Sequence, residues 1–157
     1  MALVDQVVQA GYPCGLFQCT ATPGGIGDLW ANDNAYAYID ACGPSCKVAN
    51  VGAKSGKVIL VGLSQGALSV LGYAGRYPAN VAAVQAYLPN TSLAASKANG
   101  GYTAQVNAAY GGNYTDATYG AQHSPEIQMN AATNPYTTES HTCNAVFAPA
   151  AEQTAQS

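Results

Sequence analysis

The apolar positions of this chain form two short continuous runs joined by a segment of helical periodicity. Lys57 to Val61 reads KVILV, and Val81 to Leu88 reads VAAVQAYL between Pro78 and Pro89. Runs of this length bounded by turn residues are typical of buried strands. Ala67 to Ala74 carries apolar residues on one helical face. Because a helix joins the two runs, we predict parallel strands with the helix packed across them, which is an α/β fold.

Weaker patterns precede this unit. Ala2 to Ala10 places Leu and Val at helical spacing before a glycine, and predicts a short amphipathic helix. Tyr12 to Thr20 predicts a strand. A second helix is predicted through Ala35 to Ala41, with Asn32 or Asp33 as its N-cap.

The last third of the chain has a different composition. Residues 91–157 are rich in Asn, Gly, Thr, Ala and Tyr, which favours loops with short helices. The length of 157 residues fits one domain. We therefore expect a single domain over 1–157, with a recognisable core over 1–90 and a loop-rich segment over 91–157. The tyrosines of this segment either line a substrate or glycan groove or bridge core and water: Tyr102, Tyr110, Tyr114 and Tyr119.

The turn between the first strand and its helix reads Gly-Leu-Ser-Gln-Gly at 62–66. A G-x-S-x-G motif between a strand and a helix predicts a strained turn that exposes the serine hydroxyl. Gly62 and Gly66 are predicted to let strand and helix pack closely. Ser64 is the candidate nucleophile, and the N–H of Gln65, at the positive end of the helix, is the candidate oxyanion donor. An inert turn is the alternative.

A nucleophilic serine needs a general base, and the chain has two histidines. We favour His141, because it follows a predicted loop, Asn134 to Ser140, and precedes a predicted closing helix, Ala145 to Gln156. A solvated loop histidine is the alternative. His123 stands before a proline that starts a predicted helix, which would leave it at the rim of the sheet.

The acid of a triad is less well defined. Asp116 lies in a predicted loop, Gly111 to Gly120, and fits the chain order Ser, Asp, His. A plain loop aspartate is the alternative. Glu139 is too near His141 in sequence to be the usual partner.

Three segments carry a resemblance to a known family: ALVDQVVQAGYP, NDNAYAYID and GAKSGKVILVGLSQGALSVLGYAGRYPANVAAVQAYLP. They resemble the middle of an α/β-hydrolase of the esterase/lipase type, over residues 2–90. The resemblance implies a partial hydrolase-like parallel sheet flanked by helices, with Ser64 as nucleophile, Gln65 as oxyanion donor and His141 before a closing helix. It also implies that the family's earlier strands, with the second oxyanion donor, would lie upstream of Met1.

Two functions of different classes follow. The first is a serine hydrolase of carboxylic esters, acting on a small-molecule or lipid ester through an acyl-enzyme on Ser64. The second is a non-catalytic hydrolase-like scaffold in a virion or secreted assembly. In either case, a protein partner or a second copy of the chain would complete the sheet.

Charge narrows the classes of partner. Charged residues make up 8% of the chain, the net charge is -3, and Lys and Arg form no cluster. Nucleic acid is therefore not an expected partner. No apolar run reaches the ~20 residues of a membrane span, and the opening residues show no leader. A surface rich in neutral polar residues and tyrosine favours an extracellular or virion-associated protein.

The five cysteines allow local disulfides in an oxidising compartment. Cys14 with Cys19 and Cys42 with Cys46 are the close pairs, which would leave Cys143 free. Buried free thiols are the alternative. The spacings do not match a zinc ligand set, so we expect no metal and no cofactor.

Overall fold

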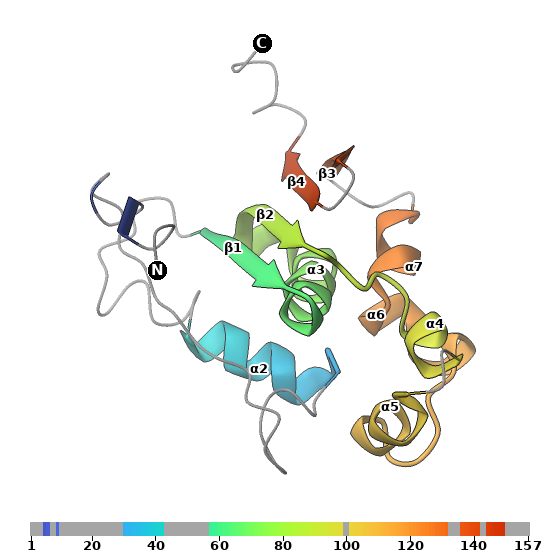
Figure 1. The fold of residues 1–157 in the computed structure, drawn as a ribbon. Helices are drawn as coiled ribbons and strands as arrows, with labels where there is room; N and C mark the ends of the chain where they lie inside the picture. Colours follow the sequence, from blue (N-terminus) through green and yellow to red (C-terminus); the bar gives the residue numbers. More distant parts are fainter. Residues whose placement is uncertain are drawn as a thin grey trace.

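The computed structural model describes residues 5, 6, 9, 30–42, 57–98, 101–131, 136–141 and 144–149, the last two ranges as backbone (Figure 1). The strands are β1 (Val58–Leu63), β2 (Val81–Tyr87), β3 (Tyr136–His141) and β4 (Asn144–Pro149). The helices are α2 (Asp33–Cys42), α3 (Gln65–Arg76), α4 (Leu93–Ala98), α5 (Thr103–Ala109), α6 (Ala121–His123) and α7 (Pro125–Met129). The described residues also form a 3-10 turn, η3 (Pro78–Asn80), and a π-helix, η4 (Asp116–Gly120).

The centre of the fold is the unit β1–α3–β2. The two strands pair in parallel, with Leu60 opposite Val84 and Leu63 opposite Tyr87, and α3 packs against both. The prediction of parallel strands crossed by a helix is therefore confirmed. β1 continues beyond Val61 to Leu63, so Gly62 and Leu63 of the predicted turn are strand.

The two faces of β1 have different environments. Leu60 is buried on the face that α3 covers, together with Val84 of β2. On the opposite face Ile59, Val61 and Leu63 are 67%, 47% and 64% exposed. The hydrophobic core therefore fills the space between the sheet and α3, and it extends to buried residues of α2 and of the segment after β2.

The sheet continues on the far side of β2 with an antiparallel hairpin. β4 pairs with β2, β3 pairs with β4, and the strand order is β1-β2-β4-β3. The predicted loop at 134–140 and the predicted helix at 145–156 are wrong where the structure describes them, because 136–141 and 144–149 are strands. Strand pairing here depends on the edge of β2, distant in sequence, and local periodicity cannot show it.

Upstream, α2 is capped by Asn32, one of the two predicted caps. Asn32 Oδ1 accepts hydrogen bonds from the backbone N–H groups of Asn34 and Ala35, at 3.0 and 3.1 Å. These bonds satisfy two donors of the first turn. α2 then lies against α3. Residues 5, 6 and 9 are helical, as predicted, whereas the predicted strand Tyr12 to Thr20 lies outside the described residues.

The segment after β2 holds more helix than predicted. α4 packs on α5, while α6 and α7 pack on α3. Tyr110 and Tyr114 are buried within this group and Tyr119 is half-buried, and Tyr114 also lines a hollow beside α4 and α5. Tyr102 is 49% exposed, and its ring lies 5.1 Å from that of Trp30. Within the described ranges, no helix is long and apolar enough to cross a bilayer.

Candidate functional site

The junction of β1 and α3, here called the elbow (Gly62–Gly66), has an unusual backbone. Ser64 has φ 54 and ψ -118, a sparsely populated region for a residue with a side chain. Its N–H donates to the carbonyl of Tyr87, at 2.9 Å, which fixes the turn to the end of β2. Ser64 is exposed and its hydroxyl makes no capping bond to α3. The turn therefore presents the hydroxyl outside the helix instead of using it as a cap.

The two glycines of the elbow have different surroundings. A Cβ built on Gly62 would lie 2.6 Å from the carbonyl oxygen of Gly66 and 2.7 Å from Cα of Ala67. Gly62 therefore permits the close approach of β1 and α3. A Cβ on Gly66 would meet nothing within 4 Å. The packing role predicted for both glycines is found at Gly62, and that part of the prediction is wrong for Gly66.

A second unusual residue lies beside the elbow. Leu88 follows β2 directly, has φ 49 and is 61% exposed. Thus Ser64 and Leu88 both adopt left-handed backbone immediately after adjacent parallel strands. Ligands of open α/β sheets bind at the carboxyl ends of the strands, and strained residues cluster at functional sites. This edge of the sheet is therefore the best candidate site in the described part of the chain.

Gln65, the candidate oxyanion donor, directly follows Ser64. It is the first residue of α3 and is half-buried. The first N–H groups of a helix have no acceptor within the helix and lie at the positive end of its dipole. A developing negative charge near Ser64 would meet this end of α3.

The backbone of His141 lies at the same edge of the sheet. It pairs with Asn144, Asn144 pairs with Tyr87, and Tyr87 pairs with Leu63, the residue before Ser64. Three strand spacings separate Leu63 from His141, about 14 Å between Cα atoms. A serine side chain, an imidazole and one hydrogen bond reach roughly 10 Å. His141 ends β3, so the described residues before it form a strand and not the predicted loop.

The structure places Asp116 in another group of elements. It begins the π-helix η4 and is exposed, and its Oδ1 accepts a hydrogen bond from Tyr114 Oη at 2.6 Å. It also lines a shallow hollow of about 460 Å³ beside α4 and α5, with Lys97 and Thr103 among the other lining residues. The described contacts of Asp116 are therefore with this helical group.

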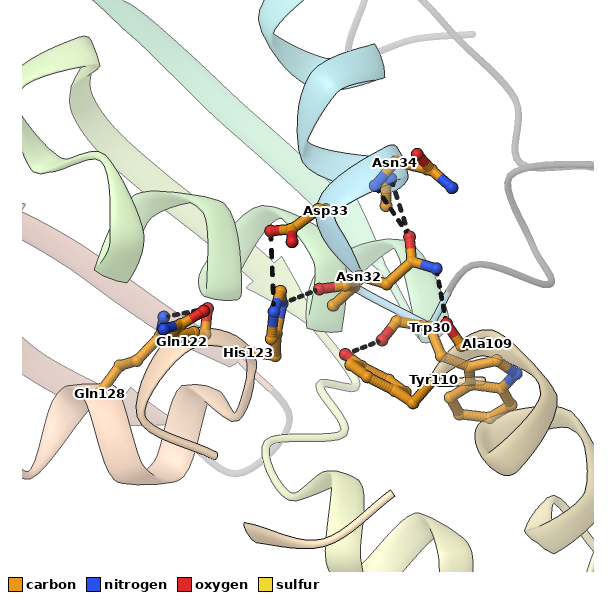
Figure 2. Close-up of polar contacts among 11 residues, drawn as sticks. Trp30, Asn32, Asp33, Asn34, Ala109, Tyr110, Gln122, His123 and Gln128 are labelled. Atoms are coloured by element: carbon orange, nitrogen blue, oxygen red, sulfur yellow. Dashed lines mark hydrogen bonds and ion pairs between the residues drawn. The ribbon is translucent and has the colours of Figure 1, made fainter. Parts of the chain in front are cut away.

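His123 is buried, not at the rim as predicted, and Figure 2 shows its contacts. Its Nδ1 lies 2.8 Å from the carbonyl oxygen of Ala31. Because a carbonyl only accepts, Nδ1 carries the proton and donates. Nε2 lies 3.7 Å from the carboxylate of Asp33, whose side chain is 71% exposed.

Aromatic rings enclose this imidazole. The ring of Tyr36 stacks on it at 5.3 Å, and Tyr110 meets it edge-on at 5.4 Å. We call His123, Ala31, Asp33, Tyr36 and Tyr110 the His123 cluster. Burial lowers the pKa of His123, although the bond to Ala31 and the charge of Asp33 oppose the shift. Burial also raises the pKa of Tyr110 and of Tyr36.

Backbone strain also occurs in the His123 cluster. Ala31 and the preceding Trp30 have φ values of 59 and 43, and the Trp30 carbonyl accepts a 2.8 Å hydrogen bond from Tyr110 Oη. Neither the left-handed pair nor the burial of His123 was predicted. One sequence signal could have indicated this cluster: aromatic residues are grouped within three separate stretches of the chain.

The elbow and the His123 cluster lie at different levels of α3. A Cβ on Gly72 would lie 3.3 Å from the His123 carbonyl oxygen, and Gly72 is about two helical turns after Ser64, roughly 12 Å along the axis. The His123 ring is engaged by Ala31 and Asp33, so the structure does not bring it to Ser64. Among the described residues, no three His, Cys, Asp or Glu side chains form a group that could hold a metal ion.

Comparison with models of protein families, with curated proteins and with solved structures gave no match for this chain.

Proposed function

We propose that this protein is a serine hydrolase of carboxylic esters, with Ser64 as the nucleophile. The observation that carries the proposal is the conformation of Ser64: φ 54 and ψ -118 at the junction of a parallel strand and a helix. A strained residue costs about 1–3 kcal/mol and persists when the surrounding structure holds it in place. A reactive hydroxyl would explain why a strained serine stands here, whereas a turn with only a structural role would favour glycine at this position.

The proposed reaction has two halves. Ser64 Oγ attacks the ester carbonyl, its proton passes to the base, and the N–H of Gln65 stabilises the oxyanion. The C–O bond to the alcohol breaks as the base returns that proton to the leaving alkoxide. Water then attacks the acyl-enzyme in the same way and releases the acid and free Ser64.

His141 is proposed as the base and Asp116 as the acid. The strand register supports His141, because its backbone ends at the same sheet edge as the elbow. Direct contact requires His141 to leave the register in which β4 and β2 separate β3 from β1, since about 14 Å exceeds the reach of roughly 10 Å. For Asp116 the support is its place in chain order alone.

The positions of Asp116 and His123 also support a second candidate function, a hydrolase-like scaffold without catalysis. Asp116 and His123 are hydrogen-bonded within helical groups away from the elbow. In that case the strained serine turn is retained through ancestry. The two candidates differ in one measurable property, the reactivity of the Ser64 hydroxyl.

The test is covalent labelling by a fluorophosphonate probe, with the labelled residue identified by mass spectrometry. We expect the native protein and a Ser92→Ala control to be labelled, and a folded Ser64→Ala variant to remain unlabelled. Ser92 is a suitable control because it lies outside the elbow, before α4. His141→Ala is expected to lose most of the labelling rate, since triad members act as a unit.

The outcomes separate the candidates. A native protein that is folded by circular dichroism and is not labelled would refute the hydrolase proposal and leave the scaffold. Labelling of Ser64 with the rate unchanged in His141→Ala would keep the nucleophile and exclude His141 as its base.

A further inference from the structure

β1 is an edge strand, because the sheet order is β1-β2-β4-β3. β2 occupies one side of β1, and within the described ranges no strand pairs with the other side (Figure 1). A free edge presents unpaired backbone N–H and C=O groups, which can pair with another strand. The edge beside the elbow is therefore a ready surface for strand addition.

β1 lacks the features that usually protect such an edge. Val58–Leu63 reads VILVGL and contains no charged residue and no proline. Natural edge strands commonly carry lysine, proline or inward-pointing charges that prevent pairing. In β1, three large apolar side chains are instead exposed on one face: Ile59, Val61 and Leu63.

We propose that this edge binds β1 of a second copy of the chain, in an antiparallel pair with its two-fold axis at Val61. In this register Val61 lies opposite its own copy, and Ile59 lies opposite Leu63 of the partner copy. Directly opposed residues of an antiparallel pair are on the same face, so the exposed apolar row of one copy meets that of the other. Leu60 lies opposite Gly62 on the other face.

The symmetry of the exposed row selects a second copy as the occupant. Ile59 and Leu63, at equal spacing from Val61, have nearly equal exposures of 67% and 64%. A two-fold interface requires this kind of self-complementary surface. The absence of charge in β1 also means that two identical strands meet without repulsion, whereas a charged partner strand would find no opposite charge there.

The contact is small. One pair of six-residue strands lies well below the ~1,200 Å² that stable interfaces bury, so we expect a weak dimer. Pairing would join two four-stranded sheets into one continuous sheet and place the two elbows near the same interface. This inference does not depend on catalysis, because it concerns backbone pairing and exposed apolar residues.

The first test is the mass of the native protein in solution over a concentration series, measured by light scattering. We expect a monomer–dimer equilibrium that Val61→Lys shifts toward the monomer by at least tenfold in dissociation constant, because two ammonium groups would meet at the axis. Val61→Thr is the matched control, and it is expected to keep the equilibrium because it retains a β-branched, uncharged side chain.

The second test fixes the register by cross-linking. Thiols introduced by Val61→Cys would be opposite each other, with Cα atoms about 5 Å apart, within disulfide range. The Cα atoms of two Ile59→Cys residues, on the same face, would be about 14 Å apart and outside that range. We expect more cross-linked dimer from Val61→Cys than from Ile59→Cys or the native chain under the same oxidation.

A native protein that stays monomeric to about 1 mM overturns the proposal. If its β1 amides are nevertheless protected from hydrogen exchange, another part of the same chain occupies the edge. Equal cross-linking of the two cysteine variants would also overturn the proposed register. None of these results depends on whether Ser64 is reactive.

Discussion

The elbow and the His123 cluster both contain left-handed backbone next to a group capable of proton transfer, but their environments are opposite. Ser64 is exposed, and the structure shows no capping bond from its hydroxyl. His123 is 3% exposed, and its ring nitrogens face Ala31 and Asp33. Backbone strain at Ser64, whose exposed hydroxyl makes no capping bond, is best explained by a function. Backbone strain around His123, which is buried and hydrogen-bonded, is offset by packing and hydrogen bonding.

This difference also explains why His123 is a poor base for Ser64. Its Nδ1 proton is donated to a backbone carbonyl, and burial lowers its pKa. The imidazole links α6 to the turn before α2. His123 therefore acts as a structural tie between two segments that are 92 positions apart.

The largest expected effect on stability tests whether the glycines of the elbow allow β1 and α3 to pack closely. Gly62→Ala should lower the free energy of unfolding by about 3 kcal/mol, because the new methyl group would overlap the backbone of α3. Gly66→Ala is the matched control and should change stability by less than about 1 kcal/mol, since nothing lies near its Cβ. Urea unfolding followed by circular dichroism measures both. Similar losses in the two variants would show that the glycines are equivalent.

A smaller effect, of opposite sign, tests strain at Ser64. Ser64→Gly should raise the free energy of unfolding by about 1 kcal/mol. Glycine adopts positive φ without strain, and its greater loss of entropy on folding cancels part of this gain. Ser64→Ala removes the same hydroxyl and keeps the strain, so its stability should be unchanged. Thermal unfolding should show a rise of ~2–4 °C for the glycine variant alone. A glycine variant less stable than the alanine variant would show that the turn is not strained.

The smallest effect tests the His123 cluster. Burial lowers the pKa of His123 in the folded state below the unfolded value of about 6.5. The unfolded chain then binds more protons, so stability is fully present above about pH 6.5 and falls as the pH drops toward the folded-state pKa. Asp33 lies beside the imidazole and limits this fall.

Urea unfolding at about pH 7.5 and about pH 5.5 measures this fall. His123→Asn, which keeps a donor for the Ala31 carbonyl and does not titrate in this range, should show a smaller loss than the native protein. An equal loss of stability in the native protein and in His123→Asn would assign the pH dependence to groups outside the His123 cluster.

Local sequence was a good guide where local interactions decide the structure. The apolar runs gave β1 and β2, the intervening periodicity gave α3, and Asn32 was one of two predicted caps of α2. The motif at 62–66 also predicted the conformation of Ser64, because few backbones connect a buried strand to a helix in so few residues.

The segment from 134 onward was predicted poorly. His141 was expected between a loop and a helix, and the structure places it at the end of β3 in a hairpin. That hairpin is held by the edge of β2, which lies more than fifty residues earlier, and no local pattern carries such pairing. The distance from His141 to the elbow, and hence the composition of a triad, depends on the same pairing.

The sequence by itself therefore determined the β1–α3–β2 unit and the serine turn, because helix periodicity, apolar runs and turn residues act over neighbouring positions. Only the tertiary structure decided the burial of His123, the separate group that contains Asp116 and the place of β1 at the edge of the described sheet. Each of these depends on which distant segments meet, and packing selects those contacts among many that the sequence allows.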